Sequence, residues 1–209
     1  MASEPIRDPV KDHLLTPQNS AFVIIDYQPI QVSSIRSMDK QELVFNIVHS
    51  CMAAINYKLP IVHSTVNVAT GVNKPPIEPV MKVLGAYPTY DRTSINSWED
   101  VEFKKAVVAT GRKKLIMAAL WTEACLTFPA LDALKEGYEV YAIADAVGGT
   151  SVEAHKAALR RIEQAGVQLI SKTQLYCELQ RDWARKETVP GFMDVFQNAD
   201  GSNPEKDNR

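Results

Sequence analysis

The sequence has few of the residues that build metal sites and disulfide frameworks. Its 209 residues include only 3 cysteines and 4 histidines. The cysteines (Cys51, Cys125 and Cys177) are too widely spaced for a CxxC pair or a disulfide framework, so we expect free thiols. The histidines form no HxH or HExxH motif, and we therefore expect no metal ion.

A dominant charge and long apolar runs are also absent. The 23 basic and 25 acidic residues give a net charge of −2, which provides no reason to expect nucleic acid or an anionic membrane as a partner. No apolar run is long enough to span a bilayer, and residues 1–15 lack the apolar core of a signal peptide. No GxGxxG or Walker pattern is present, which argues against a nucleotide cofactor. We expect a cytoplasmic protein without a cofactor.

Short apolar runs alternate with segments of helical periodicity. The runs predict buried strands at residues 21–25, 60–66, 115–120, 138–144 and 167–170, with a further short strand within the loop 87–95. The helical segments are 39–58, 76–84, 96–110, 122–135, 151–164 and 172–186. This alternation predicts an α/β fold, a three-layer α/β/α sandwich around a parallel sheet of about six strands.

The composition changes at both ends of the chain. Residues 1–19 are polar and contain three prolines, and we expect an N-terminal arm on the surface or on a neighbouring subunit. Residues 20–196 form a single domain, and residues 197–209 a polar C-terminal tail.

Three reactive or charged residues follow the predicted strands. Asp26 ends the strand 21–25, Arg92 lies in the loop 87–95, and Cys125 follows the strand 115–120. Ligands of open parallel sheets bind beyond the carboxyl ends of the strands, so we expect these side chains at one edge. A carboxylate beside a thiol supplies a general base and a nucleophile, and Arg92 would orient the carboxylate.

The segment after the strand 115–120 supports two interpretations of Cys125. With Thr122 as the N-cap, Cys125 lies in the first turn of a helix, where free N–H groups and the helix dipole favour thiolate. Alternatively, Cys125 is a small buried hydrophobe, as most free cysteines are. Pro129 predicts a kink within this helix.

Three further residues near the expected edge also allow two interpretations each. Asn96 and Trp98 either line a pocket or start a helix and fill the core. Trp121 either narrows a substrate pocket or packs against a neighbour.

Residues 24–28, 92–98, 120–125 and 145–146 resemble the isochorismatase-like cysteine hydrolases. Within that family they look most like the YcaC-type hydrolases, whose substrate is unknown. The resemblance implies the Rossmann-like isochorismatase-type fold and a metal-independent hydrolase, because the DxH motif of the nicotinamidase branch is absent. It also implies a homo-oligomer, with octamers in the YcaC group.

The resemblance assigns roles within a catalytic group of Asp26, Arg92 and Cys125. Asp26 matches the general base and Cys125 the nucleophile, which would cleave the C–N bond of a small amide through a thioester. The backbone N–H groups of Trp121 and Cys125 match the oxyanion hole, which follows a cis peptide expected between Leu120 and Trp121. The family has lysine at or beside Arg92. Arginine supplies charge but does not shuttle a proton.

The substrate, a small molecule, would lie in a pocket formed by Gln28, Asn96, Trp98, Thr122 and Phe128. An alternative function is motivated by Arg92 and Trp121. In that case the chain is a catalytically impaired oligomeric binding or scaffold protein that retains the hydrolase fold.

Overall fold

A six-stranded parallel sheet lies at the centre of the protein, in a computed structural model that describes residues 7–197. The strand order is β3-β2-β1-β4-β5-β6, so the chain starts in the middle of the sheet and winds outward in both directions. The strands are β1 (Ser20–Ile25), β2 (Ile61–Val66), β3 (Thr89–Arg92), β4 (Lys114–Ala119), β5 (Glu139–Ile143) and β6 (Gln168–Ile170). The short strand expected within residues 87–95 is β3, at one edge of the sheet.

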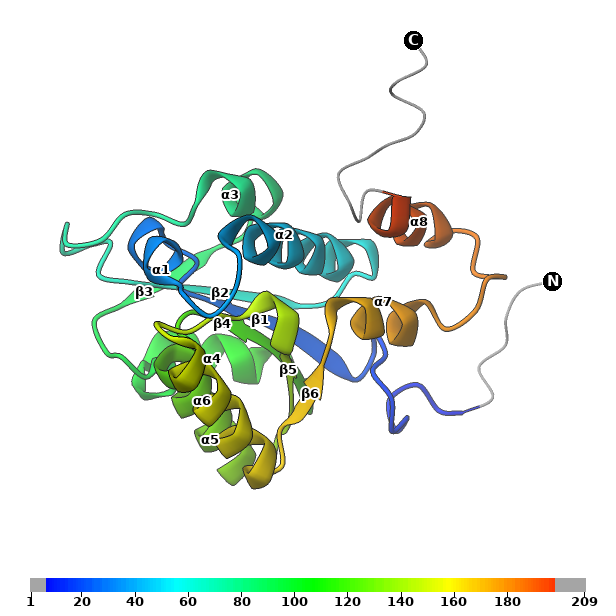
Figure 1. Cartoon of the computed structure of the whole chain (residues 1–209). Coiled ribbons are helices and arrows are strands. Elements are labelled where there is room, and N and C mark those ends of the chain that lie inside the picture. The colour runs from blue at the N-terminus through cyan, green and yellow to red at the C-terminus, as the bar shows by residue number, and fades with distance from the viewer. Residues whose placement is uncertain (1–6, 198–209) are drawn as a thin grey trace, which may run out of the picture.

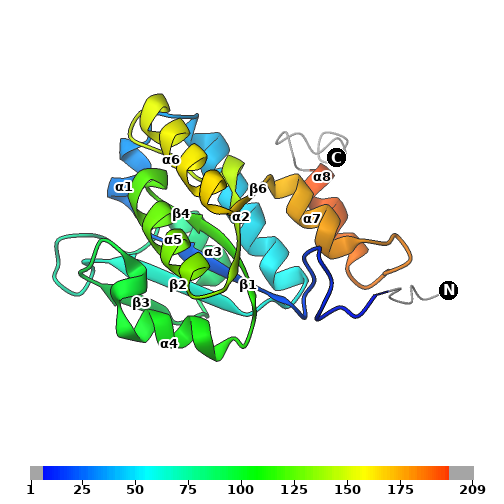
Figure 2. The ribbon, with the colours of Figure 1, turned by 90° about the horizontal axis from the view of Figure 1, so that it is seen from below.

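Helices cover both faces of the sheet, which confirms the three-layer α/β/α sandwich (Figure 1, Figure 2). The helices α2 and α3 lie on one face, and α4, α5 and α6 on the other (Figure 1). Among residues 7–197, no helix combines the length and apolarity needed to cross a membrane. The helices are α1 (Pro29–Ser34), α2 (Lys40–Asn56), α3 (Glu78–Leu84), α4 (Val101–Ala109), α5 (Thr127–Lys135), α6 (Val152–Ala165), α7 (Lys172–Gln180) and α8 (Val189–Gln197), with single turns η1 (Ser97–Glu99), η2 (Thr122–Leu126) and η3 (Ala144–Ala146).

The strands β1 and β4 form the middle of the core. Every residue of both strands is buried, which is why both segments are unbroken apolar runs in the sequence. Phe22 pairs with Ile116, and the last residues, Ile25 and Ala119, also pair with each other. The segments that follow β1 and β4 therefore start side by side at the carboxyl edge of the sheet.

The C-terminal part differs from the sequence expectation. The helix expected over residues 172–186 ends at Gln180, because Arg181 adopts a φ of +62° and turns its side chain back to the N-terminal arm. The guanidinium of Arg181 donates to Asp12 Oδ2 at 2.8 Å and to the carbonyl oxygen of Leu15 at 3.1 Å. These contacts favour a break in the helix at this residue.

The helix α8 was not expected from the sequence, since Pro190 and Gly191 argue against helix. Pro190 occupies the first turn of α8, where its missing N–H would have no intrahelical partner. Phe192 is buried, and its ring lies edge-on to Tyr176 at 6.4 Å and to Trp183 at 5.1 Å. The polar tail expected at 197–209 lies outside the described residues from position 198 onward.

Residues 7–19 of the N-terminal arm pack against their own chain, next to α7 (Figure 2). The ammonium of Lys114, at the start of β4, donates to the carbonyl oxygens of Asp12, His13 and Leu14 at 2.8, 2.6 and 3.3 Å. Leu15 is fully buried. The arm is thus held to the amino edge of the sheet, opposite the edge where the candidate site lies. Residues 1–6 are outside the described part.

His63 is fully buried in β2. Its Nδ1 lies 3.5 Å from Thr89 Oγ1, and its Nε2 has no hydrogen-bond partner among the described residues. Burial lowers the pKa of His63 from 6.5 to about 4. The folded protein therefore holds this imidazole in its neutral form.

His63 should make the protein sensitive to acid. The unfolded chain takes up this proton near pH 6.5, whereas the folded protein takes it up only near pH 4. Stability is therefore complete above pH 6.5 and decreases as the pH falls toward 4, by on the order of 3 kcal/mol. Urea denaturation measures the free energy of unfolding at pH 7 and at pH 4.5. The decrease between the two pH values should be smaller for His63→Leu than for the wild type. The exposed His13, replaced in the same way, is the control. An equal loss in the wild type and His63→Leu would contradict the assignment.

Candidate active site

Asp26 follows β1 at the carboxyl edge and adopts an unusual backbone conformation. Its φ is +62°, in the left-handed region that non-glycine residues rarely occupy. Its N–H donates to the carbonyl oxygen of Ser64 at 3.0 Å, and its own carbonyl accepts the N–H of Gln28 at 2.8 Å. The Asp26 side chain is completely buried. A buried carboxylate requires a close partner of opposite charge.

Arg92 is that partner, as the sequence predicted. Two of its nitrogens donate to the two carboxylate oxygens of Asp26, both at 2.7 Å. The same guanidinium also donates to Ser64 Oγ and to the carbonyl oxygens of Thr65 and Ile95, at 3.0–3.1 Å. Arg92 thus reaches from the end of β3 past the end of β2 to the end of β1.

The environment of Arg92 holds it in its charged form. Burial lowers its pKa, but the hydrogen bonds and the charge of Asp26 outweigh burial, and the pKa is raised. Its Nε is buried without a hydrogen-bond partner among the described residues. Arg92 can therefore balance the charge of Asp26, but it stays protonated and cannot act as an acid or a base.

Cys125 completes the group, in the turn η2 that follows β4. It is 6 % exposed, and the Asp26 carboxylate is near enough to act on the pKa of its thiol. Burial and Asp26 raise the pKa of Cys125 to about 12, although Arg92 and the backbone of Trp121 act in the opposite direction. Of the two interpretations of Cys125, the raised pKa favours the buried neutral thiol over the thiolate. The resting state is a neutral thiol beside a carboxylate.

The turn that carries Cys125 differs from the helix start that the sequence suggested. Residues 122–126 form a π-helical turn, closed by a bond from the N–H of Leu126 to the carbonyl oxygen of Trp121 at 3.2 Å. The N-cap position is Trp121, without a side-chain cap, so the prediction of Thr122 as N-cap is wrong. Pro129 is the third residue of α5, where a helix needs no donor, and the wide turn before it accommodates the proline. The peptide bond between Leu120 and Trp121 is cis, as the resemblance implied.

Three of the predicted pocket residues bind to their own chain. Gln28 donates to the carbonyl oxygens of Val66 and Lys74 and accepts the N–H of Val66, so its whole amide holds the loop after β2. Asn96 caps η1 and donates to Asp132 at 2.7 Å. Trp98 is 5 % exposed and donates its indole N–H to Glu136. For Asn96 and Trp98 these contacts favour the interpretation as helix start and core.

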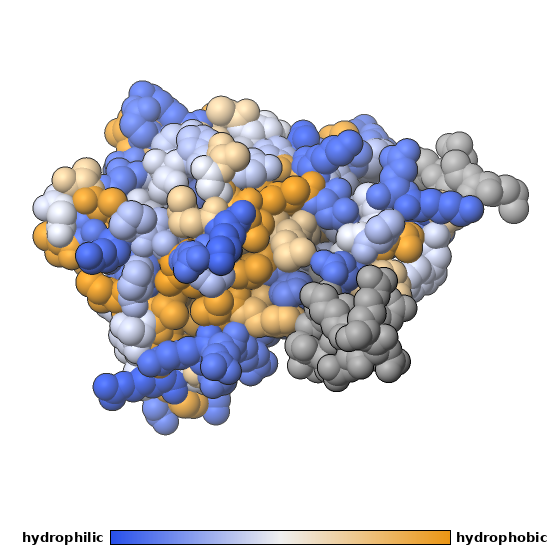
Figure 3. Space-filling view, turned by 90° about the horizontal axis from the view of Figure 1, so that it is seen from above, coloured by the Kyte–Doolittle hydropathy of each residue, from blue (hydrophilic) through white to orange (hydrophobic). Residues whose placement is uncertain are grey.

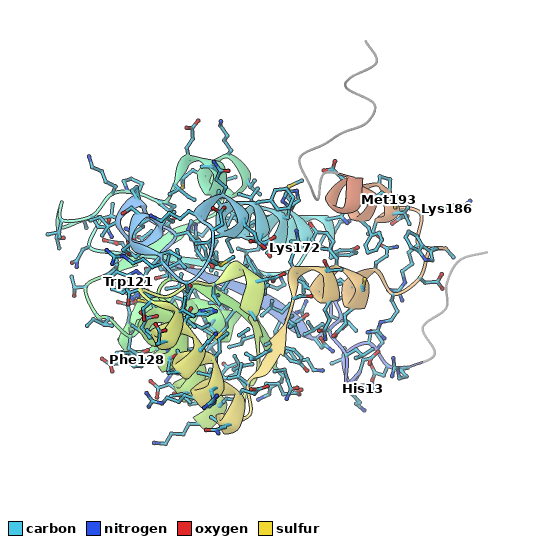
Figure 4. The ribbon with its side chains drawn as sticks, viewed as in Figure 1. His13, Trp121, Phe128, Lys172, Lys186 and Met193 are labelled. Carbon is cyan, nitrogen blue, oxygen red and sulfur yellow. The ribbon has the colours of Figure 1, made fainter. Side chains whose placement is uncertain are left out.

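The remaining pocket candidates are Phe128, which is half-buried, and Thr122, which is buried; Trp121, which the sequence left open, is also half-buried. Trp121 and Phe128 are both half-buried and lie on the side of the molecule that carries α1 (Figure 4). The indole N–H of Trp121 donates to Ser34 Oγ on α1 at 2.7 Å. Thr122 is fully buried, and its hydroxyl lies 2.8 Å from Nδ1 of His155 on α6. Sequence reasoning missed Ser34 and His155, which carry no local signal of this contact.

The described residues contain no group of three or more His, Cys, Asp or Glu side chains arranged to hold a metal ion. Sequence reasoning also missed Ser64, which contacts Arg92. A signal was present, because Ser64 is a polar residue in an otherwise strand-like run and pairs in register with Ile25, one residue before Asp26.

Comparison with known proteins identifies the family of proteins that share this fold. The sequence model of the isochorismatase domain matches residues 20–174. The chain therefore belongs to the isochorismatase family of hydrolases.

Within the family the chain is similar to YcaC proteins. It is 33% identical over 185 residues to the Escherichia coli K12 protein named Probable hydrolase YcaC, and the match covers 88% of each chain. The structure of E. coli YcaC, described as an octameric hydrolase of unknown specificity, gives a TM-score of 0.79 at 29% identity, over 95% of this chain and 98% of YcaC. YcaC from Pseudomonas aeruginosa, solved with hexane-2,5-diol and covalent acrylamide, gives 0.79 at 30% identity, over 90% and 97%.

The Asp26–Arg92 pair should dominate the stability of this edge. Arg92→Met leaves a buried carboxylate without its cation and should lower the free energy of unfolding by about 3–5 kcal/mol. Asp26→Asn should have a similar effect, and the double variant should lose less than the sum. Urea denaturation measures each value. Lys105→Met, which removes an exposed ion pair with Glu102, is the control and should change little. A near-neutral effect of Arg92→Met would refute this view of the pair.

Proposed function

We propose that this chain hydrolyses the C–N bond of a small amide, other than a peptide bond, with Cys125 as the nucleophile and Asp26 as the general base. The supporting observation is the proximity of the Cys125 thiol to the Asp26 carboxylate, whose two oxygens are both bound by Arg92. This arrangement provides a nucleophile, a proton acceptor and a fixed counter-charge in one buried group.

The steps balance within this group. Asp26 accepts the thiol proton while the sulfur attacks the carbonyl carbon, and the backbone N–H groups of Trp121 and Cys125 stabilise the resulting oxyanion. The C–N bond then breaks, and Asp26 returns the proton to the leaving amine. Water, deprotonated by Asp26, attacks the thioester carbonyl, the C–S bond breaks to release the acid, and Asp26 returns its proton to the Cys125 sulfur. Because Arg92 stays charged throughout, it acts only by positioning and balancing Asp26.

Because the pKa of Cys125 is raised, the effect of Asp26→Asn on the alkylation rate of Cys125 distinguishes two roles of Asp26. If Asp26 is the base, Asp26→Asn should slow the alkylation of Cys125 by iodoacetamide at pH 7. If Asp26 only raises the pKa of the thiol, the same substitution should speed alkylation, because Arg92 would then stabilise the thiolate. Mass spectrometry of the Cys125 peptide measures the rate, and the exposed Cys177 provides an internal control in each sample.

Loss of the nucleophile should abolish turnover. A panel of small neutral amides is assayed with the wild type, Cys125→Ser and Cys177→Ser. Cys125→Ser should reduce turnover by more than about 1000-fold, whereas Cys177→Ser should keep it. Equal turnover by the wild type and Cys125→Ser would exclude Cys125 as the nucleophile.

The same site also supports a second candidate, a binding or scaffold protein that retains the fold without the chemistry. Two observations favour it: the neutral Cys125 thiol and the engagement of both Asp26 oxygens by Arg92. Faster alkylation in Asp26→Asn, together with no turnover on any amide, would be its signature.

We also propose that the protein is a cytoplasmic homo-oligomer. The similarity to octameric YcaC supports self-association, and Cys51, Cys125 and Cys177 are all free thiols. An apolar groove of about 520 Å³ lies along α2, lined by Val44, Phe45, Val48 and Pro79, and Figure 3 shows the apolar area on this side of the molecule. A second copy of the chain would cover such a surface.

The oligomer proposal is tested by a charge placed in this groove. Val48→Glu should lower the mass measured by light scattering, because burying an added carboxylate between two apolar faces is costly. The exposed Val108, replaced by glutamate on α4, is the control and should leave the mass unchanged. A monomeric wild type, or an unchanged mass in Val48→Glu, would reject α2 as the contact face.

A further inference from the structure

The π-helical turn that carries Cys125 is fixed mainly through Thr122. The N–H of Thr122 donates to the carbonyl oxygen of Gly148 at 2.9 Å. Its carbonyl oxygen accepts the hydroxyl of Thr127 at 2.6 Å, and its own hydroxyl lies 2.8 Å from Nδ1 of His155. All three polar groups of Thr122 are therefore occupied. The bond to His155 ties the turn itself to α6 through side chains, while Trp121, the N-cap residue before the turn, is bound to Ser34 on α1.

His155 is well placed for this contact. It lies in the first turn of α6, which begins at the N-cap Ser151 and runs beside α5 in both ribbon views (Figure 1, Figure 2). The loop before α6 approaches closely, since a Cβ added at Gly149 would lie 2.9 Å from His155 Cβ and 2.7 Å from Glu123 Oε2. The backbone and Cβ of His155 are thus held close to this loop, and the residue as a whole is half-buried.

The charge state of His155 suits a hydrogen bond to a hydroxyl. Burial lowers its pKa, Glu123 acts in the opposite direction, and Lys156 lowers it further, with a lowered pKa as the net result. The imidazole is therefore neutral near pH 7, with one nitrogen free to accept. Glu123 is itself bound to the N–H and hydroxyl of Thr150 at 2.9 and 2.7 Å.

We infer that His155 is a positioning residue that sets the orientation of the Trp121–Thr122 backbone through the Thr122 hydroxyl. Its effect on reaction rests on the proposed function, because the adjacent N–H of Trp121 is one of the two proposed oxyanion donors. His155 does not contact the reacting sulfur in this arrangement. It holds the donor in place rather than taking part in proton transfer.

The test separates the hydrogen bond from packing. His155→Leu removes the imidazole partner, His155→Asn retains a polar atom near the position of Nδ1, and Thr122→Val removes the hydroxyl at constant shape. Deuterium uptake of a peptide spanning residues 120–128 is measured for each variant. Uptake should rise in His155→Leu and Thr122→Val and recover in His155→Asn. The double variant His155→Leu, Thr122→Val should be no worse than either single variant, because the two share one interaction.

A second measurement tests whether the Trp121 N–H is placed to bind an oxyanion. Small neutral aldehydes add to a thiol, and the resulting oxygen occupies the oxyanion position, so they protect Cys125 from iodoacetamide. Protection should weaken by about tenfold or more in His155→Leu and recover in His155→Asn. The alkylation rate without aldehyde should change much less, since alkylation needs the sulfur alone.

The outcomes for the two proposals are distinct. Unchanged deuterium uptake in His155→Leu and Thr122→Val would overturn the positioning role of His155, whatever the chemistry. Increased uptake in both single variants with additive effects in the double variant would also overturn it, because the residues would then act separately. Absence of aldehyde protection in the wild type would count against the proposed hydrolase, while the exchange data would still decide on His155.

Discussion

A buried guanidinium–carboxylate pair sets the geometry of the whole carboxyl edge. Asp26 and Arg92 come from β1 and β3, which are not neighbours in the sheet, so the pair forms only across the end of β2. Ser64 and Thr65, at that end, and Ile95, after β3, supply further acceptors for the guanidinium. Because an unpaired charge in this place would be very costly, any shift between the three strands is opposed by electrostatics as well as by packing.

The pair also determines which protonation states of the site are accessible. With Cys125 neutral, the buried group of Asp26 and Arg92 has no net charge. Transfer of the thiol proton to Asp26 moves the negative charge to sulfur and leaves the sum at zero. Arg92 keeps its proton in both states. Under the proposed mechanism, the chemical step therefore requires no net charge to enter or leave the buried site.

Much of the fold followed from the sequence because strands buried on both faces appear as unbroken apolar runs. The rule that parallel strands end at one edge then brought Asp26, Arg92 and Cys125 together. Features that depend on contacts between distant segments did not follow. The bond between Thr122 and His155 gives no periodic signal. Likewise, α8 was missed because its helical conformation depends on packing of Phe192 and not on local propensity.

Three of the predicted pocket residues show why the substrate is harder to infer than the position of the reactive group. Gln28, Asn96 and Thr122 are polar residues beside the site, but their side chains hold loops and turns of the chain itself. Buried polar side chains near a reactive centre therefore form hydrogen bonds within the chain, and these bonds occupy groups that a ligand would otherwise use. What remains partly exposed is aromatic, namely Trp121 and Phe128. Under the proposed mechanism, backbone donors would bind the reacting carbonyl, and substrate selection would rest on shape and apolar contact at these two rings.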